Sequence, residues 1–94
     1  AAALDKAVLQ SYYDDAAEKV FKPIRPFFER HGLKVNCVAK VGHAAETLVA
    51  QAVKGDSDLI VMGSHGHGAL ARLVLGSVAT KVLANCDTPT LLIR

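Results

Sequence analysis

Segments with the periodicity of a helix alternate with short apolar runs along this chain. The first helical segment starts at Leu4 and repeats apolar side chains every four positions, which predicts a long amphipathic helix. Pro23 and Pro26 lie inside it. Because each proline removes a backbone donor and crowds the preceding turn, a kink or restart is expected near Lys22. Gly32 is placed to end this helix.

Three short apolar runs are candidates for strands. Residues 33–40 are partly alternating and β-branched, which predicts a strand with at least one buried face. Residues 59–62 contain no polar side chain, as expected for a parallel strand that helices cover on both faces. Residues 90–93 follow Pro89 and form a third run. Residues 43–54 and 78–84 have helical spacing and separate these runs.

This order of elements, α-β-α-β-α-β, predicts an α/β fold with a parallel sheet built through right-handed crossovers. Ninety-four residues are enough for one domain and too few for two, so we expect a single domain over residues 1–94. Binding sites in such sheets lie beyond the carboxyl ends of the strands. The residues that follow Met62 are therefore the candidates for function.

Glycines bracket a loop directly after the run at residues 59–62. Gly63 and Gly66 open the loop, and Gly76 and Ser77 stand immediately before the last helical segment. Glycine lets a ligand approach the backbone closely. The start of a helix offers unpaired N–H groups and the positive end of a dipole, and Ser77 could cap that helix or donate its hydroxyl to a phosphate oxygen. Together these features predict an anion site.

Two familiar phosphate motifs do not fit this loop. Gly63 and Gly68 have the spacing of a Walker A loop, but Ala69 and Leu70 stand where that motif requires Lys and Ser or Thr. The sequence from Gly66 to Ala71 formally fits the dinucleotide fingerprint, yet no helical pattern begins there. The competing interpretation is a tight turn without a ligand, whose apolar residues only cover the core. Those residues are Leu70, Leu73, Val74 and Leu75.

The histidines and cysteines of the chain indicate no metal site. His65 and His67 form an H-x-H pair, but the neighbouring sequence offers no third ligand. Beside an anion site they would gain charge just below neutrality and raise the affinity for that anion. Cys37 and Cys86 are far apart and form no C-x-x-C motif, so we expect buried thiols rather than a zinc or redox centre.

Charge and hydropathy exclude two classes of partner. The formal charge is +2, and the Lys and Arg residues are too scattered for the basic stripe of a nucleic-acid-binding protein. The apolar runs are far shorter than the roughly 20 residues needed to cross a bilayer, and no charged-then-apolar leader precedes them. We therefore expect a soluble, cytoplasmic protein. Because the only methionine is Met62, we also expect that a segment has been removed upstream.

The spacing Gly63-x2-Gly66-x9-Gly76-Ser77, directly after the run at residues 59–62, resembles the ATP-binding branch of the universal stress protein family. Residues 41–46 resemble the strand-end turn of that family, and residues 89–93 resemble its final strand, so the resemblance covers residues 4–94. It implies a flavodoxin-like fold, of the adenine nucleotide alpha hydrolase type, with strand order 3-2-1-4-5. Measured against it, this chain holds the C-terminal two-thirds and lacks the first strand, first helix and second strand.

The resemblance also implies a site for ATP or ADP, with or without Mg²⁺. His65 stands where the family often has an arginine, which argues against a permanently charged phosphate clamp. No serine paired with a base, and no pair of carboxylates, is visible around the loop, so we expect at most slow ATP hydrolysis. The residues implied to contact the nucleotide are Met62, Gly63, His65, Gly66, Gly76, Ser77, Val78 and Ala79.

The implied role is a regulatory module of the stress response that works as a homodimer. In the family order, the absent strands would lie between residues 33–40 and residues 59–62, and their unpaired edges need partners. Strand exchange, direct pairing of these two strands or an N-terminal segment could supply them. The alternative function is a nucleotide-free, dimerising structural module. The residues implied at the dimer contact are Thr90, Leu91, Leu92 and Ile93.

Overall fold

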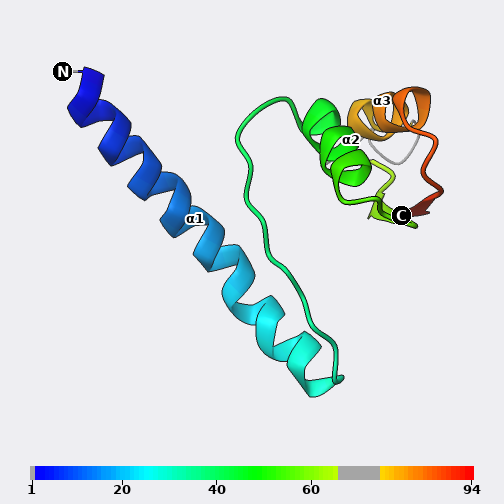
Figure 1. Cartoon of the computed structure of the whole chain (residues 1–94), viewed down its shortest axis with the longest axis horizontal. Coiled ribbons are helices and arrows are strands. Elements are labelled where there is room, and N and C mark those ends of the chain that lie inside the picture. Colours follow the sequence, from blue (N-terminus) through cyan, green and yellow to red (C-terminus); the bar gives the residue numbers. More distant parts are fainter. Residues whose placement is uncertain (1, 66–74) are drawn as a thin grey trace. The chain divides into compact units, whose positions relative to one another are not determined.

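The computed structural model describes residues 2–65 and 75–94 (Figure 1). The chain divides into two compact units, Ala1–Ala39 and Lys40–Arg94, which are considered separately. The first contains α1 (Ala2–Arg30). The second contains α2 (Ala44–Lys54), β1 (Ile60–Gly63), α3 (Ser77–Asn85) and β2 (Thr90–Ile93).

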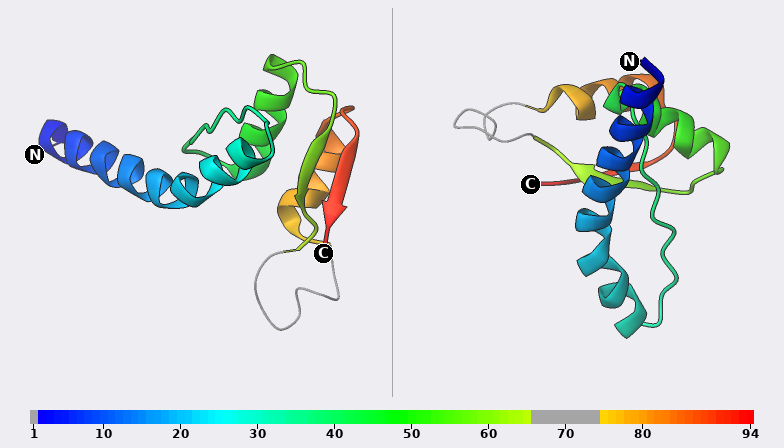
Figure 2. Two further views of the ribbon diagram at one scale, coloured as in Figure 1. Left: turned by 90° about the horizontal axis from the view of Figure 1, so that it is seen from below. Right: turned by 90° about the vertical axis from the view of Figure 1, so that its left-hand side faces the viewer.

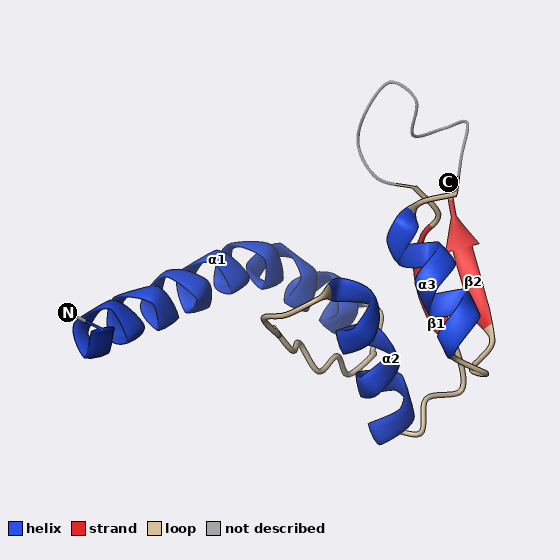
Figure 3. Cartoon of the chain, turned by 90° about the horizontal axis from the view of Figure 1, so that it is seen from above, coloured by secondary structure: helices blue, strands red, loops and turns tan. Residues whose placement is uncertain are grey.

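The long helix predicted at the start of the chain is confirmed as α1, and it continues through Pro23 and Pro26 without a restart. Figure 3 shows that its axis curves, as expected where prolines remove backbone hydrogen bonds. Gly32 adopts φ +68° just after the helix. The Gly32 N–H donates to the carbonyl of Glu29, and the N–H of Leu33 donates to that of Phe28, each over 3.0 Å. This pair of bonds is a Schellman motif, which ends α1 as predicted.

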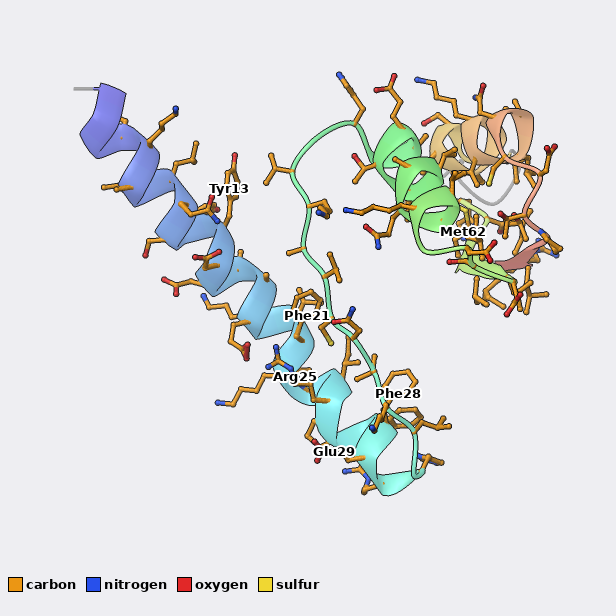
Figure 4. The ribbon with its side chains drawn as sticks, viewed as in Figure 1. Tyr13, Phe21, Arg25, Phe28, Glu29 and Met62 are labelled. Atoms are coloured by element: carbon orange, nitrogen blue, oxygen red, sulfur yellow. The ribbon has the colours of Figure 1, made fainter. Side chains whose placement is uncertain are left out.

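One face of α1 is half-buried within its own unit. Tyr13, Ala17, Phe21, Ile24 and Phe28 share this face at helical spacing. Figure 4 shows the rings of Phe21 and Phe28 directed toward the segment that follows the helix. Two aromatic pairs stand edge to face: the ring centroids of Tyr12 and Tyr13 are 6.0 Å apart, and those of Phe27 and Phe28 are 5.6 Å apart.

The strand predicted over residues 33–40 is wrong: this segment is extended but forms no strand. Leu33 and Val38 are exposed rather than buried. Alternating β-branched residues favour an extended backbone, but a strand also requires a partner for its N–H and C=O groups. Within the second unit, β1 pairs with β2 in a two-stranded sheet.

The second unit is a parallel β-α-β arrangement, as predicted. β1 and β2 pair in parallel, with Ile60 opposite Thr90 and Gly63 opposite Ile93. α3 connects the two strands, and α2 packs beside it. Figure 2 shows both helices on the same side of the strands. This adjacency of the two strands agrees with the positions of the last two strands in the order 3-2-1-4-5.

The core lies between these helices and the sheet. Its buried residues are Ala45, Ala52, Ile60 and Val82, and Val49, Met62, Val78 and Cys86 pack around them. Side chains alternate along β1, so Ile60 and Met62 face the helices while Val61 is 59% exposed on the other face. Within this unit, α2 and α3 therefore cover the face of β1 that carries Ile60 and Met62.

Within residues 2–65 and 75–94, no helix combines the length and apolarity needed to cross a membrane. The same described residues contain no group of three His, Cys, Asp or Glu side chains arranged to bind a metal ion.

Candidate anion-binding site

The end of β1 and the start of α3 lie side by side in the structure. The N–H of Gly76 donates a 2.7 Å hydrogen bond to the carbonyl of Ser64, and the N–H of Ser64 donates a 2.8 Å bond to the carbonyl of Ile93. Ser64 therefore joins the ends of both strands to the residue that precedes α3. This brings Gly63, Gly76 and Ser77 close together.

α3 begins at Ser77, with Gly76 in the N-cap position. Ser77 is thus the first helical residue rather than the cap, which corrects one of the two roles expected for its side chain. The first intrahelical bond runs from the N–H of Thr80 to the carbonyl of Gly76, at 2.9 Å. The N–H groups of Ser77, Val78 and Ala79 precede it and have no partner within α3. They offer donors at the positive end of the helix dipole.

The backbone N–H of Gly76, unlike those of Ser77, Val78 and Ala79, already has a hydrogen-bond partner. It donates to the carbonyl of Ser64. The hydroxyl of Thr80 donates to the carbonyl of Gly76 over 2.9 Å, in addition to the bond from the Thr80 N–H. In this arrangement Gly76 anchors the start of α3 to the end of β1. The backbone N–H groups that lack a partner within α3 are those of the next three residues, Ser77, Val78 and Ala79.

Three of the implied site residues have side chains that serve packing. Met62 and Val78 pack against the core cluster, and Ala79 is only 2% exposed. Their side chains are committed to the core. A ligand at this edge would therefore meet backbone atoms of these residues.

Gly63 is not required by the surrounding structure. A Cβ atom built at this position would lie 3.8 Å from its nearest neighbour, the carbonyl of His65, which is ordinary van der Waals contact. Gly63 is not among the glycines with positive φ. Gly76 likewise has φ −62° and ψ 152°, which any residue can adopt.

His65 is half-buried, and its Nδ1 lies 3.1 Å from the Oγ of Ser64. No serine paired with a base was expected near the loop, so this contact is a correction. The two residues are adjacent in the chain. No sequence motif indicates the contact between Ser64 and His65, because its geometry depends on how the backbone turns after β1. Gly66 and His67, together with Gly68 and residues 69–74 of the competing interpretations, lie outside the described residues.

Two open grooves lie on the helical side of this unit. The larger, of about 510 Å³, runs between α2 and α3. The smaller, of about 310 Å³, lies beside α2 near Lys40 and Lys54. Neither includes a residue of the candidate anion site. That site is an edge formed by backbone groups.

Comparison with known proteins gives a consistent result. The universal stress protein family matches residues 2–94. Universal stress protein MJ0531 of Methanocaldococcus jannaschii is 34% identical over 80 residues, which are 85% of this chain and 47% of that protein. Universal stress protein MJ0577 of the same organism is 31% identical over 86 residues, or 92% of this chain and 53% of that protein.

A bacterial relative extends the comparison. Stress response protein NhaX of Bacillus subtilis is 29% identical over 82 residues, which are 87% of this chain and 49% of that protein. The chain thus spans about half the length of these relatives. No solved structure matches the chain.

Proposed function

The chain belongs to the universal stress protein family, and on this premise we propose that it binds ATP or ADP at the edge formed by β1 and α3, as a cytoplasmic regulatory module of the stress response. The bound nucleotide changes a surface that partner proteins recognise.

The observation that carries this proposal is the start of α3. The N–H groups of Ser77, Val78 and Ala79 have no partner within the helix, and the bond between Gly76 and Ser64 holds them at the carboxyl end of the strands. Negatively charged oxygens are stabilised by such groups and by the helix dipole. A phosphate chain fits this set of donors.

The glycines support the same proposal. Neither Gly63 nor Gly76 has a backbone angle that demands glycine, and Gly63 has room for a side chain. Close approach of a ligand to the backbone gives a reason for the missing side chains.

A regulatory role is favoured over a catalytic one. The contact between Ser64 and His65 is the one pairing of a hydroxyl with a base that the described site offers. The described residues give His65 no third group to orient it, as a hydrolytic triad requires. Slow ATP hydrolysis is the most that this arrangement supports.

The proposal is tested by isothermal titration calorimetry of ATP and ADP with the full chain. Ser77→Ala removes one hydroxyl donor to a charged phosphate, at a cost of roughly 1.5–3 kcal/mol, so affinity should fall about 10- to 150-fold. Gly76→Val should also weaken binding, because its Cβ and methyl groups obstruct the approach of the ligand while φ remains allowed.

Ser11→Ala, which removes an exposed hydroxyl from α1, is the matched control and should leave the affinity unchanged. The assignment is wrong if ATP and ADP do not bind, or if both site variants bind them as tightly as the parent chain.

A second candidate function is a nucleotide-free homodimer that acts as a structural module. Leu91 and Ile93 are each about half exposed on the face of β2 that lies opposite α2 and α3, and they support a subunit contact that includes Thr90 and Leu92. The absence of nucleotide binding in the same titration, combined with a stable dimer, would favour this candidate.

A further inference from the structure

α1 carries a second apolar face that its own unit leaves open. Val8, Tyr12 and Val20 are 61%, 67% and 59% exposed, and Leu9 and Phe27 are about half exposed. We call Val8, Leu9, Tyr12, Ala16, Val20 and Phe27 the α1 ridge. The ridge is distinct from the half-buried face that contains Phe21 and Phe28.

The spacing of the α1 ridge is that of a helix-pairing surface. Leu9, Ala16, Val20 and Phe27 follow one another at intervals of seven, four and seven residues. Residues at such intervals form one stripe along a helix, as in the seam of a coiled coil. At 1.5 Å per residue, this helix of 29 residues is about 43 Å long.

The ridge is complementary to itself when two helices run antiparallel. With position 18 of one copy opposite position 18 of the other, Leu9 faces Phe27 and Ala16 faces Val20. A small side chain then meets a larger one on both sides of the two-fold axis. The shared contact is isologous, as in most homodimers.

Charge favours the same arrangement. Acidic residues predominate in the first half of α1, at Asp5, Asp14 and Asp15, and basic residues predominate in the second half, at Lys19, Lys22, Arg25 and Arg30. Lys6 and Glu29 are exceptions, and Glu18 is paired with Arg25 in its own helix. Antiparallel pairing brings Asp5 near Arg30 of the second copy, whereas parallel pairing would place like charges together.

We propose that two copies of this chain associate through the α1 ridge as an antiparallel helix pair. The mixed signs beside the ridge distinguish it from a membrane-surface helix, which carries mainly Lys and Arg on its polar face. This contact uses neither β2 nor the start of α3, so it is independent of the proposed nucleotide site and of the proposed contact at β2.

A charge exchange tests the complementarity. In chains that also carry Leu91→Asp, the dissociation constant measured by sedimentation equilibrium should rise up to about fivefold for each altered pair in Asp5→Lys or Arg30→Asp. The double variant Asp5→Lys/Arg30→Asp restores opposite charges and should recover the parent value. Equal weakening by both single variants and the double variant would contradict the register.

Disulfide cross-linking tests the orientation directly. In full chains with Cys37→Ser and Cys86→Ser, one carrying Ala16→Cys and one carrying Val20→Cys, mild oxidation of the mixture should give a mixed disulfide dimer. Each chain alone should cross-link much more slowly, because identical positions are offset by about 6 Å along the axis. Both substituted residues are exposed, so folding should be preserved.

A chain with Ser11→Cys, on the opposite side of α1, is the control and should give no more than background cross-linking with either partner. Faster cross-linking of each chain with itself would indicate parallel pairing and overturn the proposal. A mixture that cross-links no faster than the Ser11→Cys control would show that the α1 ridge is not a contact between copies.

Discussion

Glu18 and Arg25 form an ion pair two turns apart on α1. Arg25 Nη1 donates to Glu18 Oε1 over 2.7 Å and to Oε2 over 2.6 Å. The hydrogen bond from Arg25, followed by the charges of Arg25 and Lys22, lowers the pKa of Glu18. The same bond raises the pKa of Arg25, with a smaller contribution from Cys37.

This pair predicts acid sensitivity of α1. Because the pKa of Glu18 is lowered on folding, its stabilising effect is present above its ordinary value of 4.5 and is lost as pH falls below that value. Helical circular dichroism should therefore decrease on acidification. Glu18→Gln should reduce this dependence, whereas Glu29→Gln should not. An unchanged acid transition in Glu18→Gln would contradict the prediction; both side chains of the pair are about half exposed, so a modest effect is expected.

Among the secondary-structure elements, α1 departs furthest from ideal sequence preference, since it retains Pro23 and Pro26 in its interior. Each proline deletes a backbone hydrogen bond and crowds the turn before it, at a cost of up to about 3 kcal/mol. Pro23→Ala and Pro26→Ala should each raise the midpoint of thermal unfolding, followed by circular dichroism.

Pro89→Ala, outside the helices, is the control for these variants. The backbone carbonyl of residue 89, which accepts a 2.8 Å hydrogen bond from the N–H of Ile60, is retained in this variant. If the helical prolines can be replaced with no gain in stability, tertiary packing rather than backbone bonding determines the stability of α1.

The elements that the sequence predicted well are those whose signals are local. Apolar periodicity and the flanking glycines located α1, α2 and α3, and the apolar runs located β1 and β2 to within one residue. Residues 33–40 failed because their alternating pattern says nothing about a pairing partner. The role of Ser64 could not be predicted, since it bonds Gly76 and Ile93 through backbone atoms that every residue possesses.

The loop glycines and the following helix start pointed to an anion site, and the family resemblance specified a nucleotide as its ligand. Loop glycines alone left a ligand-free turn open as an interpretation. The structure adds that Gly76 acts as an anchor and that the donors lie at Ser77, Val78 and Ala79. The difference between Gly76 and the three donor residues depends on which carbonyl accepts a hydrogen bond from each N–H. No sequence pattern predicts it.

At the scale of the whole molecule, the face of the sheet that lies opposite α2 and α3 predicts self-association. Val61, Leu91 and Ile93 are each half or more exposed on that face. We expect the full chain to sediment as a dimer or larger at micromolar concentration, and Leu91→Asp to weaken the contact by placing a charge in it. Lys81→Asp, an exposed charge change on α3, is the control. A folded parent chain that sediments as a monomer would contradict both this contact and the pairing of α1.

The edge-to-face tyrosine pair on α1 also determines the intrinsic fluorescence of this protein. Tyr12 and Tyr13 are its only tyrosines, and it has no tryptophan, so its intrinsic fluorescence originates in α1 alone. Tyr12 belongs to the exposed α1 ridge, and its emission responds to whatever covers that ridge. A dilution series followed by tyrosine emission therefore isolates the association of α1 from events at the nucleotide edge, with no added dye.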